Sequence, residues 1–135
     1  MRKTVLILLV SLIIAAPCTA NACRHAVTPD ERVRESYDAV VIATITSTEP
    51  KPIFLNALPT WTATAQLTQT VDGKPDTTQF VISKPENLCE VGQDIPDVGA
   101  SWVLYMRKDA TRWTVAASYP LNLAREIDKR FANQP

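Results

Sequence analysis

The chain has 135 residues, with 14 basic and 14 acidic side chains and one histidine, so its formal charge at neutral pH is zero. Two of the basic residues lie in an N-terminal export segment, and its removal leaves 12 basic against 14 acidic residues, a net charge of −2. A mildly acidic chain has no bulk attraction for phosphate backbones or anionic lipids, which argues against nucleic acid as a partner. The length suits one domain with one core.

The first 22 residues have the pattern of an export signal. Two basic residues precede an apolar run over residues 5–16, and these 12 residues are fewer than the roughly 20 needed to cross a bilayer. Ala20 and Ala22 form the A-x-A pattern that signal peptidase recognises. We therefore expect cleavage after Ala22, no stable membrane anchor, a secreted or periplasmic product, and a single mature domain over residues 23–135.

The cysteines predict one disulfide in the mature chain. Cys18 lies inside the signal, which leaves Cys23 and Cys89. An even pair in an oxidising compartment is typical of a disulfide, and closing this loop would stabilise the domain by about 4 kcal/mol. Lipidation of Cys23 is the alternative, although Ala20 stands where a lipobox has a large aliphatic residue. Acylation would block the amine of Cys23 and consume its thiol.

The first predicted elements of the mature chain are a short helix and a central strand. Thr28-Pro29-Asp30-Glu31 forms a capping box with proline at the first helical position, which predicts a helix to about Tyr37. Residues 39–46 are almost entirely β-branched or small and predict a buried strand. Residues 49–59 contain three prolines and predict a long loop.

The next segment predicts a β-hairpin. Residues 61–68 alternate with period two, which places Trp61, Ala63, Ala65, Leu67 and, further along, Val71 on one face of a strand. An Asp-Gly turn signal at residues 72–73 leads into a third strand over residues 77–83.

The C-terminal part predicts an irregular segment, a second hairpin and a helix. Residues 84–99, with Cys89, are rich in proline, glycine and acids. Residues 101–107 and 112–117 predict two strands around a turn at residues 108–111. Apolar residues at helical spacing then predict an amphipathic helix: Leu123, Ala124, Ile127 and Phe131. Together the elements predict a mainly β fold, a five-stranded OB-type Greek-key barrel with a short N-terminal helix and a C-terminal helix.

This order of elements resembles the N-terminal inhibitory domain of the tissue inhibitors of metalloproteinases, a netrin-like OB barrel. The resemblance spans nearly all of the mature chain. It rests on a cysteine directly after the signal, the YDAVVIATI strand at residues 37–45, and a lone Cys89 before the WVLYM hairpin at residues 102–106. In that family the N-terminal cysteine binds the catalytic zinc of the target protease through its α-amine and carbonyl, and a disulfide holds it in place.

The resemblance implies that Cys23 contacts zinc and pairs with Cys89. It also implies the following protease-contact edge: Cys23, Arg24, His25, Ala26, Leu88 and Glu90. The chain departs from the family in three respects. Arg24 would enter the specificity pocket, which is apolar in typical targets; His25 stands in place of a second cysteine, whose partner position falls near Ala117; and the third bridge is absent.

The chemistry of a free N-terminus supports metal binding independently. An α-amine has a reference pKa of about 8, so a useful fraction is neutral near pH 7 and can bind a metal together with its own carbonyl. In contrast, His25 is the only histidine, and no serine can be matched to a base, so we expect no catalytic residue, no cofactor and no intrinsically bound metal.

The aromatic residues of the strands favour core packing over ligand binding. Trp61, Trp102, Tyr105 and Trp113 could stack bases on a barrel face, but base stacking usually accompanies a basic groove, and the mature chain is acidic. A carbohydrate or small-ligand platform stays open as an alternative.

The sequence therefore predicts an exported protein-binding module that is not an enzyme. The leading expectation is inhibition of a zinc metalloprotease through the free amine of Cys23. The alternative is a non-catalytic periplasmic or extracellular interaction domain that binds another exported protein without metal contact. The target and the oligomeric state do not follow from the sequence.

Overall fold

The computed structural model describes residues 27–50, 61–84 and 94–134. The predicted export signal, most of the loop before Trp61 and both mature cysteines lie outside these ranges. Within them, no helix is long and apolar enough to span a membrane. The elements in chain order are α1 (Pro29–Arg32), β1 (Ala39–Pro50), β2 (Trp61–Asp72), β3 (Gln79–Ser83), β4 (Ser101–Asp109), β5 (Arg112–Pro120) and α2 (Leu121–Ile127).

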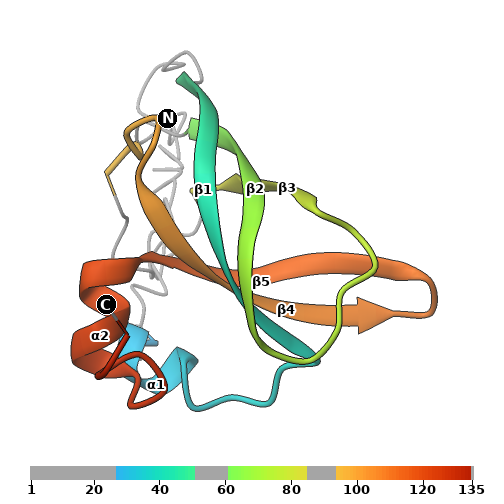
Figure 1. The fold of residues 1–135 in the computed structure, drawn as a ribbon, viewed down its shortest axis with the longest axis vertical. Helices are drawn as coiled ribbons and strands as arrows, with labels where there is room; N and C mark the ends of the chain where they lie inside the picture. The colour runs from blue at the N-terminus through green and yellow to red at the C-terminus, as the bar shows by residue number, and fades with distance from the viewer. Residues whose placement is uncertain (1–26, 51–60, 85–93, 135) are drawn as a thin grey trace, which may run out of the picture.

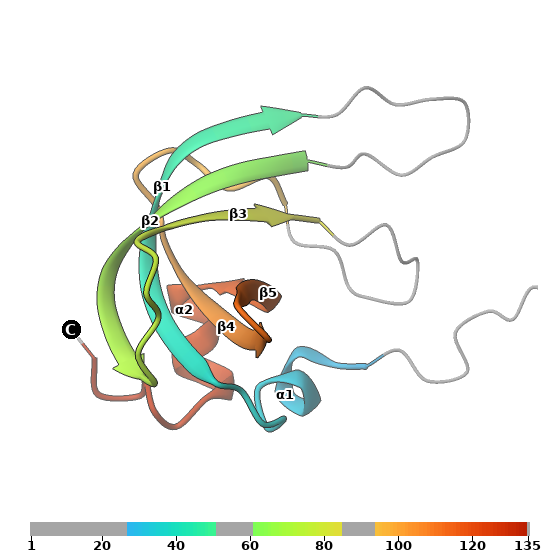
Figure 2. The same cartoon turned by 90° about the vertical axis from the view of Figure 1, so that its right-hand side faces the viewer.

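The five strands form one antiparallel sheet in the order β3-β2-β1-β4-β5. The mainly β class, the central position of β1, the two hairpins and the C-terminal helix are confirmed. The sheet is strongly curved but is not closed into a barrel, because β3 and β5 remain its two edges (Figures 1 and 2). β5 leads into α2, which packs on the face of the sheet opposite the concave core. The OB-type barrel therefore stays a prediction.

The concave face of the sheet carries the larger of two apolar clusters. Alternating residues of β1 and β2 meet even-numbered residues of β3 and β4 there, as period-two patterning requires. Trp61 and Trp102 are buried and meet edge to face with ring centroids 5.7 Å apart. Trp113 is half-buried against the same cluster. The expected core role of these aromatic residues is confirmed.

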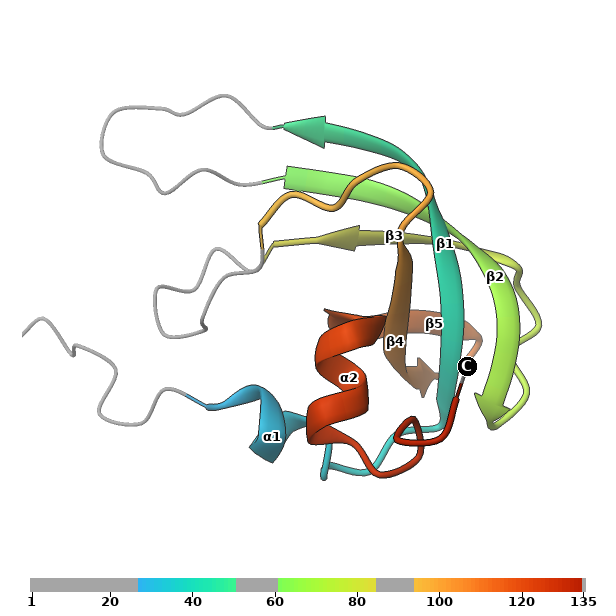
Figure 3. The same cartoon turned by 60° about the vertical axis from the view of Figure 1, so that its left-hand side comes forward.

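The second apolar cluster lies between the other face of the sheet and the helices. Val40 and Ile42 of β1 and Tyr105 of β4 pack there against Ala124 of α2 and against Phe131, which follows it. All five side chains are buried. α2 therefore covers the sheet with the apolar stripe that the sequence predicted, as Figure 3 shows for the helix beside β4.

The placement of Val71 corrects one prediction. Val71 packs against the helix-covered cluster and not beside Leu67 on the concave face. The pairing of β1 with β2 shifts between Val40 and Val41 and between Ile42 and Ala43, where β2 advances two residues for one of β1. Each such bulge breaks the alternation of side chains, so a period-two pattern cannot be extended through it.

Several element ends also differ from prediction. β1 continues to Pro50, which pairs with Trp61, so the loop does not start at Glu49. α1 ends at Arg32 rather than Tyr37, with the amide of Glu35 bonded to the carbonyl of Arg32 in a tighter turn.

α2 ends at Ile127, because Asp128 has extended backbone angles. Phe131, which the sequence placed in this helix, is buried from the turn that follows it.

Candidate functional site

All predicted contact residues lie outside the described part of the chain: Cys23, Arg24, His25, Ala26, Leu88, Cys89 and Glu90. The structure therefore does not test whether they meet or whether the disulfide forms. It does show where the described chain adjoins them. The Lys84 amide donates to the Trp61 carbonyl (3.1 Å), and Trp61 pairs with Pro50. Figures 2 and 3 place these strand ends and the start of the α1 segment on the same side of the molecule.

The segment that follows the predicted N-terminal edge is held by its own capping box. The amide of Thr28 donates to Glu31 Oε2 (2.9 Å), and the amide of Glu31 donates to Thr28 Oγ1 (3.3 Å). Val33, at the end of this helix, is buried in the helix-covered cluster. The predicted capping box is thus confirmed, and it fixes the direction in which the chain enters α1 at Thr28.

Two side chains attach the α1 segment to the sheet. The hydroxyl of Tyr37 donates to the carbonyl of Arg32 (2.6 Å), and the Tyr37 ring lies 5.2 Å from that of Tyr105. Glu35 forms ion pairs with Arg32 on its own segment and with Arg107 of β4. These contacts order a helix of only four residues, which would not be stable alone.

A buried carboxylate connects the C-terminal segment to the same region. Asp128 is 6% exposed and accepts a hydrogen bond from the Tyr105 hydroxyl (2.8 Å). Arg130 donates to both oxygens of Asp128 and also to the carbonyl of Val33 (3.2 Å). We call Tyr105, Asp128 and Arg130 the Asp128 clamp. It joins the sheet, the C-terminal segment and α1.

The electrostatics of the clamp favour the ion pair. Burial alone would raise the pKa of Asp128, but the hydrogen bonds from Arg130 and Tyr105 outweigh it and lower that pKa. Burial and the neighbouring carboxylate raise the pKa of the Tyr105 hydroxyl. The hydrogen bond to Asp128 also raises the pKa of Arg130, so the pair stays charged across the physiological range.

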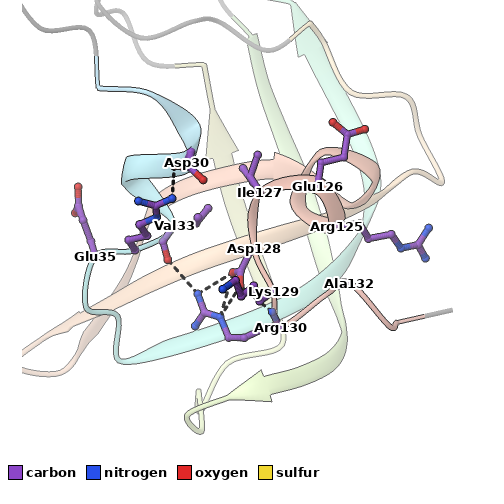
Figure 4. Close-up of a pocket in the computed structure, with 11 residues that line it drawn as sticks. Asp30, Val33, Glu35, Arg125, Glu126, Ile127, Asp128, Lys129, Arg130 and Ala132 are labelled. Atoms are coloured by element: carbon purple, nitrogen blue, oxygen red, sulfur yellow. Dashed lines mark hydrogen bonds and ion pairs between the residues drawn. The ribbon is translucent and has the colours of Figure 1, made fainter.

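Asp128 and Arg130 of the clamp line an open pocket of about 700 Å³ between α1 and α2 (Figure 4). Its rim carries both signs of charge, with Arg34 paired to Asp30 (2.6 Å) on one side. Arg125 has no hydrogen-bond partner for Nε among the described residues and points away from the clamp. Such a rim suits a polar protein surface, because each charge could meet an opposite one.

Sequence reasoning missed the clamp, although a signal was present. Asp128 stands between Ile127 and Phe131, two residues assigned to the apolar face of the predicted helix. An acid in that position needs a partner when buried, and Arg130 is the nearest basic residue that can also reach α1. Among the described residues, no group of three or more histidine, cysteine or acidic side chains could hold a metal ion.

Comparison of the chain with models of known protein families, with curated proteins and with solved structures found no match. The netrin-like resemblance therefore rests on the order of elements and on the cysteine positions alone.

Proposed function

We propose that the mature chain is an exported protein-binding module built on a partly open OB-type barrel. Its contact edge comprises residues 23–26 together with Leu88 and Glu90 beside Cys89. One observation supports this edge most directly: the chain ends next to the two cysteine-bearing segments lie on one side of the sheet (Figures 2 and 3). A disulfide between Cys23 and Cys89 would hold the new N-terminus there.

In the metal-directed form of this function, the edge inhibits a zinc metalloprotease. The α-amine and carbonyl of Cys23 would together chelate the protease zinc; the amine would replace the water that the enzyme otherwise holds, and the carbonyl would add a fifth ligand. The disulfide and the capped α1 segment order this end before binding, which reduces the entropy lost in the complex. Arg24 then follows into the specificity pocket, so the target has an acidic or open pocket rather than an apolar one.

The second candidate is binding of an exported protein without metal contact. Arg24 favours this candidate. In the metal-directed form, this charged side chain would enter the specificity pocket of the protease, which is apolar in typical targets. The mixed charges around the pocket between α1 and α2 fit such a polar interface.

The test begins with N-terminal sequencing and intact mass of the exported protein. We expect Cys23 as the first residue and a mass lowered by about two hydrogens, as one disulfide requires. A different first residue, two free thiols, or an added lipid would contradict the contact edge in both forms.

A one-residue extension separates the two forms. Addition of alanine before Cys23 displaces the amine, so inhibition of zinc metalloproteases should be lost if the amine binds the metal. A chain with alanine added after Pro135 is the matched control and should keep full inhibition. Inhibition that survives the N-terminal extension would exclude the metal-directed form. If the chain extended before Cys23 and the chain extended after Pro135 capture an exported partner protein equally well, the second candidate is favoured.

A further inference from the structure

A groove lies between the two edge strands of the sheet, at the end of β3 that lies away from Lys84. It has a volume of about 530 Å³, within the range of binding sites for small ligands. Its lining comes from β3, from the segment just before β3, and from the turn and strand at the start of β5. Figure 1 shows the segment between β2 and β3 beside the β4–β5 hairpin, where Lys108 Nζ approaches Asp76 Oδ2 (3.8 Å).

The spacing of the edge strands limits what can occupy the groove. Cα atoms of β3 and β5 come within 8 Å of one another, although the two strands do not pair. A third strand between them would need about 4.8 Å on each side, or roughly 9.6 Å in total. The groove is therefore suited to a small molecule that lies against the side chains, and not to a peptide strand.

The floor of the groove is apolar and only partly covered. Phe80 of β3 and Trp113 and Val115 of β5 line the groove, and all three side chains contribute to the concave core. Phe80 is buried, but Trp113 and Val115 are only half-buried. An apolar ligand would remove their exposed surface from water, which is favourable. A ligand with an aromatic ring would also make edge-to-face or offset contacts with Phe80 and Trp113.

The rim of the groove is polar and carries an unpaired positive charge. Side chains alternate along a strand, so the exposed neighbours of the floor residues form the rim: Gln79, Val81, Arg112 and Thr114. Arg112 has no ion-pair or hydrogen-bond partner in the described part of the chain, and this includes Asp109, its cross-strand neighbour in the hairpin. The guanidinium is therefore available to a ligand.

The charges beside the groove favour a ligand with a single negative charge. Among the described residues that line the groove, Asp76 is the one acid, and Lys108 lies beside it. Arg112 is then the cation left without an opposite charge. A planar guanidinium donates two parallel hydrogen bonds to a carboxylate. One unpaired cation matches a monocarboxylate better than a phosphate ester, which carries a charge of nearly −2 at neutral pH.

We infer that the groove between β3 and β5 binds a small aromatic monocarboxylate, with its ring on the apolar floor and its carboxylate against Arg112. This site goes beyond the proposed contact edge and does not depend on Cys23. Either proposal can therefore fail without the other.

The test uses the mature chain, labelled with ¹⁵N, and 2-naphthoate as the probe. We expect saturable NMR shifts at the amides of Val81 and Thr114 and at the indole N–H of Trp113, with Lys129 unchanged. The indole is a suitable reporter, because its N–H is buried and has no hydrogen-bond partner in residues 27–50, 61–84 and 94–134. No saturable shift up to millimolar naphthoate would overturn the site.

An uncharged analogue tests the role of Arg112. 2-Naphthalenemethanol keeps the ring and replaces the carboxylate with a hydroxymethyl group. It should bind the natural chain about two- to fivefold more weakly than naphthoate, as loss of an exposed ion pair predicts. This difference should vanish in Arg112→Gln and persist in Arg125→Gln, which removes a cation outside the groove. Equal binding of the two ligands to the natural chain, or a difference that persists in Arg112→Gln, would overturn the role of Arg112.

Substitutions of the rim and the floor test where the ligand lies. Val81 is 68% exposed, so Val81→Glu and its uncharged match Val81→Gln should both fold. At low ionic strength, naphthoate should bind Val81→Glu more weakly than Val81→Gln because like charges repel, whereas the alcohol should bind both equally. Trp113→Leu should weaken both ligands, and unchanged amide shifts in β1 would verify its fold. Equal binding of naphthoate to the two Val81 variants would overturn the inference.

Discussion

Single residues at the two hairpin turns illustrate how local backbone conformation sets stability. Ala110 has a positive φ of 49° in the turn between β4 and β5, and Gly73 has a φ of 72° in the turn after β2. The left-handed region disfavours any residue with a Cβ atom. At Gly73 a Cβ would also collide with the carbonyl of Asp38 and with Ala39.

We expect Ala110→Gly to stabilise the domain by about 0.5–1 kcal/mol, because relief of the left-handed penalty exceeds the added entropy of the unfolded chain. Urea denaturation measures this change. Thr111→Gly, in the same turn, is a suitable control and should not stabilise, because Thr111 has no positive φ.

Gly73→Ala should have the opposite effect and destabilise the domain by roughly 2 kcal/mol or more, since both strain and a main-chain collision oppose it. The midpoint of thermal unfolding measures it. Replacement of the nearby exposed Lys74 by alanine is the control. An unchanged midpoint for Gly73→Ala would show that the turn relaxes freely.

The carboxylate of Asp128 predicts a loss of stability in acid. Its pKa is lower in the folded chain than the ordinary value of 3.8. The folded state therefore binds a proton less readily than the unfolded state, and the contribution is complete above about pH 4 and is lost as the pH falls through the folded pKa. Unfolding free energies between pH 7 and pH 2 should fall more steeply for the natural chain than for Asp128→Asn.

At pH 7, Asp128→Asn should itself cost about 1–3 kcal/mol, because buried hydrogen bonds to a charged group are lost. Asp30→Asn is the matched control. Asp30 pairs with Arg34 at the surface, and its loss should cost less than about 1 kcal/mol.

At the level of elements, the Asp128 clamp makes the positions of α1 and the C-terminal segment depend on each other. Arg130→Gln removes the guanidinium donors to Asp128 and to the Val33 carbonyl, while the main-chain amide of residue 130 and the Tyr105 hydroxyl still donate to Asp128. Hydrogen exchange should then accelerate in residues 32–38 while the amides of β1 keep their protection. Arg125 has no hydrogen-bond partner for Nε in residues 27–50, 61–84 and 94–134, so Arg125→Gln removes a similar charge and should leave exchange unchanged. Equal acceleration in both variants would rule out the clamp as the link.

The elements themselves were largely predictable, because each carries a local signal. Alternation identified β2, β-branched residues identified β1, and the capping box identified α1. The bulges at Thr68 and Val71 were not predictable, since they depend on pairing with β1 and leave no mark in the sequence of β2 alone. The clamp was missed because Tyr105 and the carbonyl of Val33, both distant in the chain, meet the neighbouring Asp128 and Arg130 only in the folded state. Closure of the sheet into a barrel would require the edge strands β3 and β5 to pair with each other. The periodicity of the sequence does not encode whether they do.

At the scale of the whole molecule, the proposed Cys23–Cys89 disulfide should be the largest single contribution to stability. Reduction should lower the free energy of unfolding by about 4 kcal/mol, because the unfolded chain regains the entropy of an open loop. Urea denaturation with and without reductant measures it. In a double Cys23→Ser, Cys89→Ser variant, reductant should leave the free energy of unfolding unchanged. Equal urea midpoints for the oxidised and the reduced natural chain would contradict the disulfide and therefore the proposed contact edge.

The central position of β1 also determines when the polypeptide can fold. β1 has β2 on one side and β4 on the other, and β4 begins more than 50 residues after β1 ends. Until β4 arrives, β1 exposes an apolar strand with an open edge, and the first hairpin has no partner for its buried face. Folding should therefore begin only once most of the polypeptide is available, and fragments that stop before Ser101 should aggregate rather than fold.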